Sequence, residues 1–322
     1  MEPYWNFLDE PDPSLIYRRS EHEDSRFGEA LETRRDKFGE HFKVVLVGFP
    51  YDEGTVRNKG RLGGASGPDE VRRAFYRLTP TKSAALPDAE VHVFDAGNLK
   101  KHMKLEDALS KLEAIANYLL RFGYTPIVLG GSNDLSYADF KACDAVRGRC
   151  GAINIDSHLD VRENLNGINS GTPYRMLIEE KILRGTDFVE YGTQDFANSR
   201  QHLAYVRAAK AQVYTLHQIR SRRNSEEFME AYRLAGKETG SVYVSFDMDS
   251  VRSSDAPGVS APTPTGLTAE EVLECAYLAG SEPKTAMIDV CELNPKYDAD
   301  GRTAKLAAMI VANFLAGLAN RY

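Results

Sequence analysis

Short apolar runs alternate along the chain with stretches in which apolar residues recur at helical spacing. Eight runs from residue 43 onward have the length and apolar content of buried strands. They cover residues 44–47, 91–94, 127–129, 152–155, 188–191, 213–216, 242–244 and 286–288. Helical spacing is clearest over residues 67–78, 105–120 and 304–318. Strands that alternate with helices predict an α/β fold, in which helices cover both faces of a parallel sheet.

The first 42 residues depart from this pattern, because they are charged and show little periodicity. We interpret residues 1–42 as an N-terminal arm that is packed on the domain or partly disordered. No internal repeat, low-complexity tract or linker interrupts residues 43–322, so we expect them to form one domain.

The charge balance argues against two broad classes of function. Forty basic residues stand against 47 acidic ones, which leaves a net charge of −7 and a pI near 5.6. A general nucleic-acid binder or membrane-surface protein would be basic. No apolar run reaches the length of a membrane span, and the N-terminus lacks the basic and apolar regions of a signal peptide. These features predict a cytoplasmic protein.

Four cysteines in a chain of this length do not indicate a disulfide framework. Cys143 and Cys150 are close enough in sequence to pair if they are oxidised. Buried free thiols are the interpretation that we favour.

Charged and polar side chains follow the run at 152–155 with a spacing of two residues. Asp156, His158 and Asp160 would project on one side if the extended conformation continued that far. Two carboxylates and an imidazole in one place repel one another and are costly to bury, unless a positive charge lies among them. The spacing therefore predicts a divalent metal site.

A second apolar strand ends in the same way, with Asp247 and Asp249. Together the two clusters offer more ligands than one ion with open positions needs, and they suit a pair of metals that share carboxylates. A helix cap or a turn is the alternative explanation for a single D-x-D after a strand. The turn at 130–134, with the sequence G-G-S-N-D, also follows a strand, and Asn133 or Asp134 could reach the same region.

Five blocks in this order resemble the ureohydrolase family, which comprises arginase, agmatinase and formiminoglutamase. Three carry the family's metal signatures: G-G-S-N-D, D-S-H-L-D at 156–160 and S-F-D-M-D at 245–249, the last continuing to P-G-V-S-A-P at 257–262. The others are the late strand at 287–295 and the opening strand and loop at 48–50 and 63–69.

The resemblance implies a three-layer α/β/α catalytic domain around an eight-stranded parallel sheet, with two manganese ions per chain. One ion would bind Asn133, Asp156, Asp160 and Asp247, and the other Asp156, His158, Asp247 and Asp249. Asp160 would also bind the attacking water and pass on its proton. Glu292 would face the planar cationic group of the substrate.

Two departures from the family pattern favour one branch. Asn133 stands where most members have a histidine ligand; its amide oxygen is a donor that manganese accepts, so the first site is either occupied with weaker affinity or lost. Residues 169–175 contain no histidine to act as general acid, so Asp160 or water would have to protonate the leaving amine. The sequence S-G-T-P-Y-R in this stretch resembles formiminoglutamases more than arginases.

The implied reaction is hydrolysis of N-formimino-L-glutamate, an intermediate of histidine degradation, to L-glutamate and formamide. The two carboxylates of this substrate require local cations, for which Arg162 is the first candidate and Arg175, Arg57 and Arg61 are further ones. We interpret the histidines outside the clusters as structural; they are His22, His41, His92, His102, His202 and His217.

Two alternatives remain at this point. One is a guanidinium hydrolase that releases urea from arginine or agmatine, and the other is a metal-deficient, non-catalytic family member. In each case the partner expected is a small molecule, without nucleic acid or membrane. The resemblance also implies a homo-oligomer, a trimer or larger.

Overall fold

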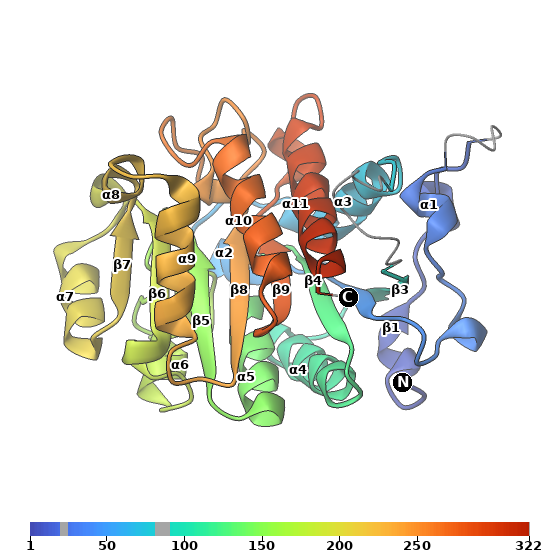
Figure 1. Cartoon of the computed structure of the whole chain (residues 1–322), viewed down its shortest axis with the longest axis horizontal. Helices are drawn as coiled ribbons and strands as arrows, with labels where there is room; N and C mark the ends of the chain where they lie inside the picture. Colours follow the sequence, from blue (N-terminus) through green and yellow to red (C-terminus); the bar gives the residue numbers. More distant parts are fainter. Residues whose placement is uncertain (20–24, 81–90, 322) are drawn as a thin grey trace.

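The computed structural model describes residues 1–19, 25–80 and 91–321. Its strands are β1 (Leu8–Asp9), β2 (Val44–Phe49), β3 (Val93–Leu99), β4 (Thr125–Gly130), β5 (Cys150–Ile155), β6 (Phe188–Thr193), β7 (Gln212–Thr215), β8 (Ser241–Asp247) and β9 (Thr285–Cys291). They form one nine-stranded sheet in the order β1-β3-β2-β4-β9-β8-β5-β6-β7 (Figure 1). Every neighbouring pair is parallel except β1 with β3. The predicted sheet of eight parallel strands is confirmed, with a ninth strand at its edge.

The largest differences from the prediction concern two strands, β1 and β3. The two-residue strand β1 is too short to produce any periodicity in the sequence. Strand β3 continues past the predicted run at 91–94, through Asp95. A buried aspartate is tolerated there because a buried arginine neutralises its charge. Arg72 donates to both oxygens of Asp95, at 2.8 and 2.9 Å, and both side chains are fully buried.

Successive residues of each central strand pack into two different cores. Val44 and Leu46 belong to one cluster of buried residues, and Val45 and Val47 belong to the other. Because both faces of the sheet are buried, the strands read as continuous apolar runs and not as an alternation of apolar and polar residues.

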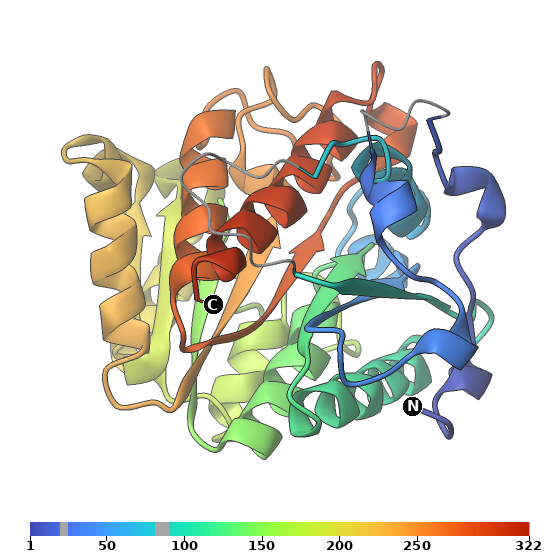
Figure 2. The ribbon, with the colours of Figure 1, turned by 45° about the vertical axis from the view of Figure 1, so that its right-hand side comes forward.

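Helices cover the two faces of the sheet as separate layers, which Figure 2 shows on opposite sides. One layer contains α3 (Gly67–Phe75), α8 (Leu216–Arg220), α9 (Asn224–Ala235), α10 (Ala269–Ser281) and α11 (Arg302–Ala319). The other contains α4 (Leu105–Arg121), α5 (Leu135–Arg147), α6 (Pro173–Glu179) and α7 (Arg200–Ala209). The short helices α1 (Phe27–Ala30) and α2 (Glu53–Arg57) lie in connecting segments. The predicted three-layer α/β/α fold is confirmed.

Helix α11 is long and apolar enough to cross a membrane by length and composition. Its 18 residues have a mean hydropathy of 1.3, and 67% of them are buried within the molecule. It packs against α10 and α3 as part of the core. Burial on this scale accounts for the apolar composition, since a core helix must be apolar on most of its faces.

The N-terminal segment packs against the edge of the sheet. Met1, Trp5 and Leu8 are buried in the same core as α4, and β1 pairs with β3. Residues 20–24, which include His22, lie outside the described residues. The division of the chain at residue 42 stays a prediction.

All four cysteines are buried and free, as the sequence indicated. The Sγ atoms of Cys143, on α5, and Cys150, at the start of β5, are 2.8 Å apart. Both thiols lie at the end of the sheet away from the carboxyl ends of the strands.

Candidate metal centre

The predicted ligands come from strands that are neighbours in the middle of the sheet. The order β4-β9-β8-β5 places the carboxyl ends of four parallel strands side by side. Asn133 follows β4, Glu292 follows β9, Asp247 ends β8 and Asp156 follows β5. Ile155 pairs with Phe246, so Asp156 and Asp247 are at the same level of the sheet. In parallel α/β sheets this edge is where ligands bind.

The first cluster converges through a turn and not, as its spacing suggested, through continued extension of the strand. Strand β5 ends at Ile155, and Asp160 has a positive φ of 42°. Oδ1 of Asp156 accepts a hydrogen bond of 2.7 Å from the backbone N–H of His158, which shapes the turn. A non-glycine residue in the left-handed region costs on the order of 1–3 kcal/mol, so the rest of the structure must hold Asp160 in place.

The second cluster serves both interpretations of its D-x-D spacing. Asp247 accepts a 2.8 Å hydrogen bond from the backbone N–H of Asp249 and so caps a short 3₁₀ helix (Met248–Ser250). Its carboxylate is nevertheless within reach of Asp156 and Asp160. The capping alternative is therefore correct locally, and it leaves the metal site intact.

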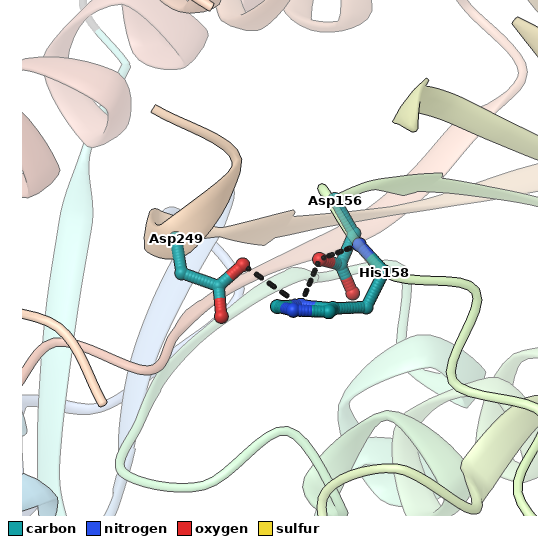
Figure 3. Close-up of side chains that lie close together, drawn as sticks. All are labelled: Asp156, His158 and Asp249. Carbon is teal, nitrogen blue, oxygen red and sulfur yellow. Dashed lines mark hydrogen bonds and ion pairs between the residues drawn. The ribbon is translucent and has the colours of Figure 1, made fainter. Parts of the chain in front are cut away.

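Five side chains form two overlapping ligand groups that share Asp156. One group is Asp156, His158 and Asp249, and the other is Asp156, Asp160 and Asp247; in each group the ligand atoms lie within 4.8 Å of one another. Nδ1 of His158 is 3.3 Å from Oδ1 of Asp156 and 3.2 Å from Oδ1 of Asp249 (Figure 3). A shared carboxylate between two groups is the geometry of a two-metal site.

The electrostatics of the cluster fit a pair of hard divalent cations. Burial and the neighbouring carboxylates raise the pKa values of Asp160 and Asp247 well above the usual range of an aspartate. The same causes raise the pKa of Asp249 to about 7. The negative charge of Asp249 in turn raises the pKa of His158. Within the described residues, only His158 forms a salt bridge with these carboxylates, and Oδ1 of Asp249 has no hydrogen-bond partner. Oxygen-rich sites with one imidazole suit Mn²⁺.

Asn133 lies beside the cluster, with its amide held at both ends. Nδ2 donates a hydrogen bond to Asp160, and Oδ1 accepts one of 2.6 Å from Ser136. The two ends of an amide are assigned from such partners, so ligation by Oδ1 would require the side chain to turn over. Its role as a ligand stays a prediction.

Glu292 is fixed at the floor of the site by donors from three segments. Oε1 accepts hydrogen bonds from Thr55 Oγ1 at 3.0 Å and from the backbone N–H of Asn133 at 2.9 Å, and Oε2 accepts one from Ser260 Oγ. Like Asp160, Glu292 has a positive φ, here 61°. Arg61 donates to the backbone carbonyls of Val259 and Ser260 and so holds the Ser260 loop. These contacts position the carboxylate and leave it at the cavity surface.

A cavity of about 220 Å³ opens over the cluster. Its predicted lining residues are His158, Asp160, Arg162, Asp247, Asp249 and Glu292. Within the described chain, Arg57 and Arg175 are absent from the lining. Arg57 is paired with Glu53 and Glu106, and Arg175 with Glu163 and Glu179.

The chain resembles known proteins over most of its length. Residues 42–317 match the arginase family. A formimidoylglutamase from Hahella chejuensis is 34% identical over 291 residues, which is 85% of each chain. The chain belongs to the arginase family. This confirms the resemblance that the sequence blocks indicated.

Solved structures of arginase-family relatives superpose closely. The crystal structure of Trypanosoma cruzi formiminoglutamase with Mn²⁺ has a TM-score of 0.86 and 36% identity, covering 93% of this chain and 100% of that one. The proclavaminate amidino hydrolase of Streptomyces clavuligerus has a TM-score of 0.82 and 25% identity, covering 96% and 99%. The formimidoylglutamase of Bacillus subtilis, at 24% identity and a TM-score of 0.87, supports the fold alone.

The arginase-family cavity also contains residues that the sequence did not single out. Lys59, Asn58 and Ser260 come from loops, and His202, which we interpreted as structural, comes from α7. Lys59 and His202 carry no motif and are far apart in the chain, so the fold alone brings them together. The resemblance did cover the Ser260 loop, without giving Ser260 a role.

Proposed function

We propose that this chain is a manganese-dependent formimidoylglutamase that hydrolyses N-formimino-L-glutamate to L-glutamate and formamide. The observation that carries the proposal is one cavity in which a floor of carboxylates meets a wall that contains Arg162, which forms no salt bridge within the described residues. The acidic floor suits two cations and an amidine, while the arginine suits a carboxylate of the substrate. Relatives named formimidoylglutamase support this choice of substrate.

Two Mn²⁺ ions would supply a water that is activated at neutral pH. The residues that would hold them are Asp156, His158, Asp160, Asp247 and Asp249, with Asn133 beside them. Glu292 binds the planar N–C–N group of the substrate, because its carboxylate is fixed by Thr55 and Ser260 and faces the cavity. Asp160 accepts a proton from the attacking water and passes it to the leaving nitrogen. Its position beside Asn133 Nδ2 keeps one carboxylate oxygen engaged and the other available.

Parallel assays of formamide and urea test the proposal. Mn²⁺-loaded protein should release formamide from N-formimino-L-glutamate at least about a hundredfold faster than urea from L-arginine or agmatine, because agmatine has no carboxylate to pair with Arg162 and L-arginine has only one. Asp247→Ala should abolish formamide release, whereas Asp107→Asn, an exposed acid on α4, should not. Predominant urea release, or no turnover by a metal-loaded chain, would contradict the proposal.

Cytoplasmic location and a homo-oligomer of three or more copies are also part of the proposal. The location rests on the four buried free thiols, and the oligomer rests on the family resemblance. Light scattering on the purified chain tests the second point, and a monomer at working concentration would contradict it.

A further inference from the structure

The cavity is divided by charge into a floor and a rim. Asp160, Asp247, Asp249 and Glu292 form the floor. We call Lys59, Arg162 and His202 the basic rim, because these basic side chains line the same cavity from three separate segments. They lie in the turn after α2, in the segment after β5 and on α7, respectively.

Lys59 and Arg162 form no salt bridge with any acid in the described parts of the chain. Neighbouring arginines behave differently, since Arg57 and Arg175 each pair with two glutamates. Lys59 and Arg162 line the same cavity without an ion pair in the described residues, so both are available to bind an anionic ligand there.

The backbone fixes where the Lys59 side chain begins. The N–H of Lys59 donates to the carbonyl of Val56 at 2.9 Å, and that of Gly60 donates to the carbonyl of Thr55 at 2.8 Å. These bonds hold Lys59 in the left-handed region, with a φ of 64°. The hydroxyl of Thr55 also binds Glu292, so the same turn positions a floor carboxylate and a rim cation.

Arg162 is held next to the metal cluster. It follows Asp160 by two residues, which limits the separation of their Cα atoms to about 7 Å. Its N–H donates to the carbonyl of Gly171 at 2.7 Å, and its side-chain stem packs on the space that a Cβ at Gly171 would fill. Arg162 therefore lies near the metal cluster, where the reacting end of a substrate would bind.

His202 contributes a neutral group to the rim. Burial and the positive charge of Arg162 lower the pKa of His202. The imidazole is then uncharged at neutral pH and acts as a hydrogen-bond donor or acceptor. The rim thus offers two fixed positive charges, which is the number of carboxylates on an acyclic amino dicarboxylic acid.

We propose that Arg162 binds the α-carboxylate of the substrate and that Lys59 binds its side-chain carboxylate, which makes Lys59 the residue that selects a dicarboxylic amidine. The α-carboxylate is attached to the carbon that bears the reacting nitrogen, so it belongs with the cation nearest the floor. The side-chain carboxylate reaches further out, toward a long flexible lysine. This assignment rests on the proposed function and adds the residue that recognises the far end.

The test compares two substrates that differ in one charge. N-Formimino-L-glutamate carries both carboxylates, and N-formimino-L-glutamine replaces the side-chain carboxylate with an amide of the same shape. For the Mn²⁺-loaded chain, Lys59→Met should raise KM for the first substrate about tenfold and leave KM for the second within about twofold, with little change in kcat. Arg162→Met should raise KM for both substrates.

Two further variants control for structure. Lys210→Met removes a lysine with the same φ of 64° at the end of α7, outside the cavity lining, and should leave both KM values unchanged. Lys59→Arg should restore most of the lost affinity, since the charge returns.

The outcomes separate the two claims. Equal KM changes for both substrates in Lys59→Met, or no change for either, would overturn the role of Lys59 while formamide release stands. Failure of the wild-type, metal-loaded chain to release formamide from N-formimino-L-glutamate would instead overturn the proposed function itself.

Discussion

Asn133 donates a hydrogen bond from Nδ2 to Oδ2 of Asp160, joining the segment after β4 to the segment after β5. Asn133 is the residue that the family resemblance placed among the metal ligands. The bond also supports a residue in the left-handed region, since Asp160 has a φ of 42°. We therefore expect Asn133 to affect metal binding, either as a ligand or through its hydrogen bond to Asp160.

Removing this amide should weaken one of the two metal positions. We expect Asn133→Ala to lower Mn²⁺ affinity at the weaker site about tenfold to a hundredfold, because a ligand or its supporting hydrogen bond is lost. Metal titration followed by calorimetry measures both sites. Asn313→Ala, on α11, is the matched control, since its Nδ2 donates to the Met309 carbonyl within its own helix. Two unaltered affinities in Asn133→Ala would show that Asn133 does not contribute.

The Arg162 side chain depends on the absence of a side chain at Gly171. A Cβ there would lie 2.5 Å from Cδ and 2.9 Å from Nε of Arg162, so Gly171→Ala must displace the guanidinium. We expect KM for N-formimino-L-glutamate to rise severalfold, up to about tenfold, with kcat nearly unchanged. Gly240→Ala is the control, because its nearest atom is a carbonyl at 3.5 Å. An unchanged KM in Gly171→Ala would mean that Arg162 does not bind substrate.

A second buried acid, away from the metal ligands, should make stability depend on pH. Asp289 on β9 is fully buried and accepts hydrogen bonds from Tyr243 and Ser245, and burial raises its pKa from 3.8 to about 7. Because its folded-state pKa exceeds the unfolded value, the folded chain holds an extra proton between these two values. The stability contributed by this group is complete below about pH 4 and is lost as the pH rises toward about 7.

Asp289→Asn should remove that dependence. The difference in free energy of unfolding between wild type and variant should fall by up to about 1.4 kcal/mol per pH unit as the pH rises through this range. Urea unfolding of chelator-treated proteins at several pH values measures it. Parallel curves for the two proteins would contradict the assigned shift.

The sequence predicted the sheet well because each strand is buried on both faces. Val44 to Val47 all face apolar cores, so the pattern needed no tertiary information. Strand β1 was missed because two residues are too few to show a periodic pattern of apolar and polar positions. The end of β3 was missed because Asp95 is tolerated only beside Arg72, which lies on a different element.

The cluster of candidate ligands could be predicted because these residues are local in sequence, although one premise was wrong. Asp156 and Asp160 meet through a turn, and the extended strand on which the spacing argument relied stops at Ile155. The substrate side could not be predicted in the same way. Arg57 ends helix α2 near the site, yet Glu53 and Glu106 hold it outside the cavity lining. Lys59 and His202 face the cavity only because the fold brings their segments together.

Manganese content tests the central claim most directly. The chain should be stripped with a chelator, loaded with Mn²⁺, desalted and analysed by mass spectrometry of the metal, with circular dichroism to confirm folding. The account predicts about two Mn²⁺ per chain, about two in Asp107→Asn, and less than one in Asp156→Ala, which removes the shared ligand. A folded wild-type chain that retains almost no manganese would contradict it.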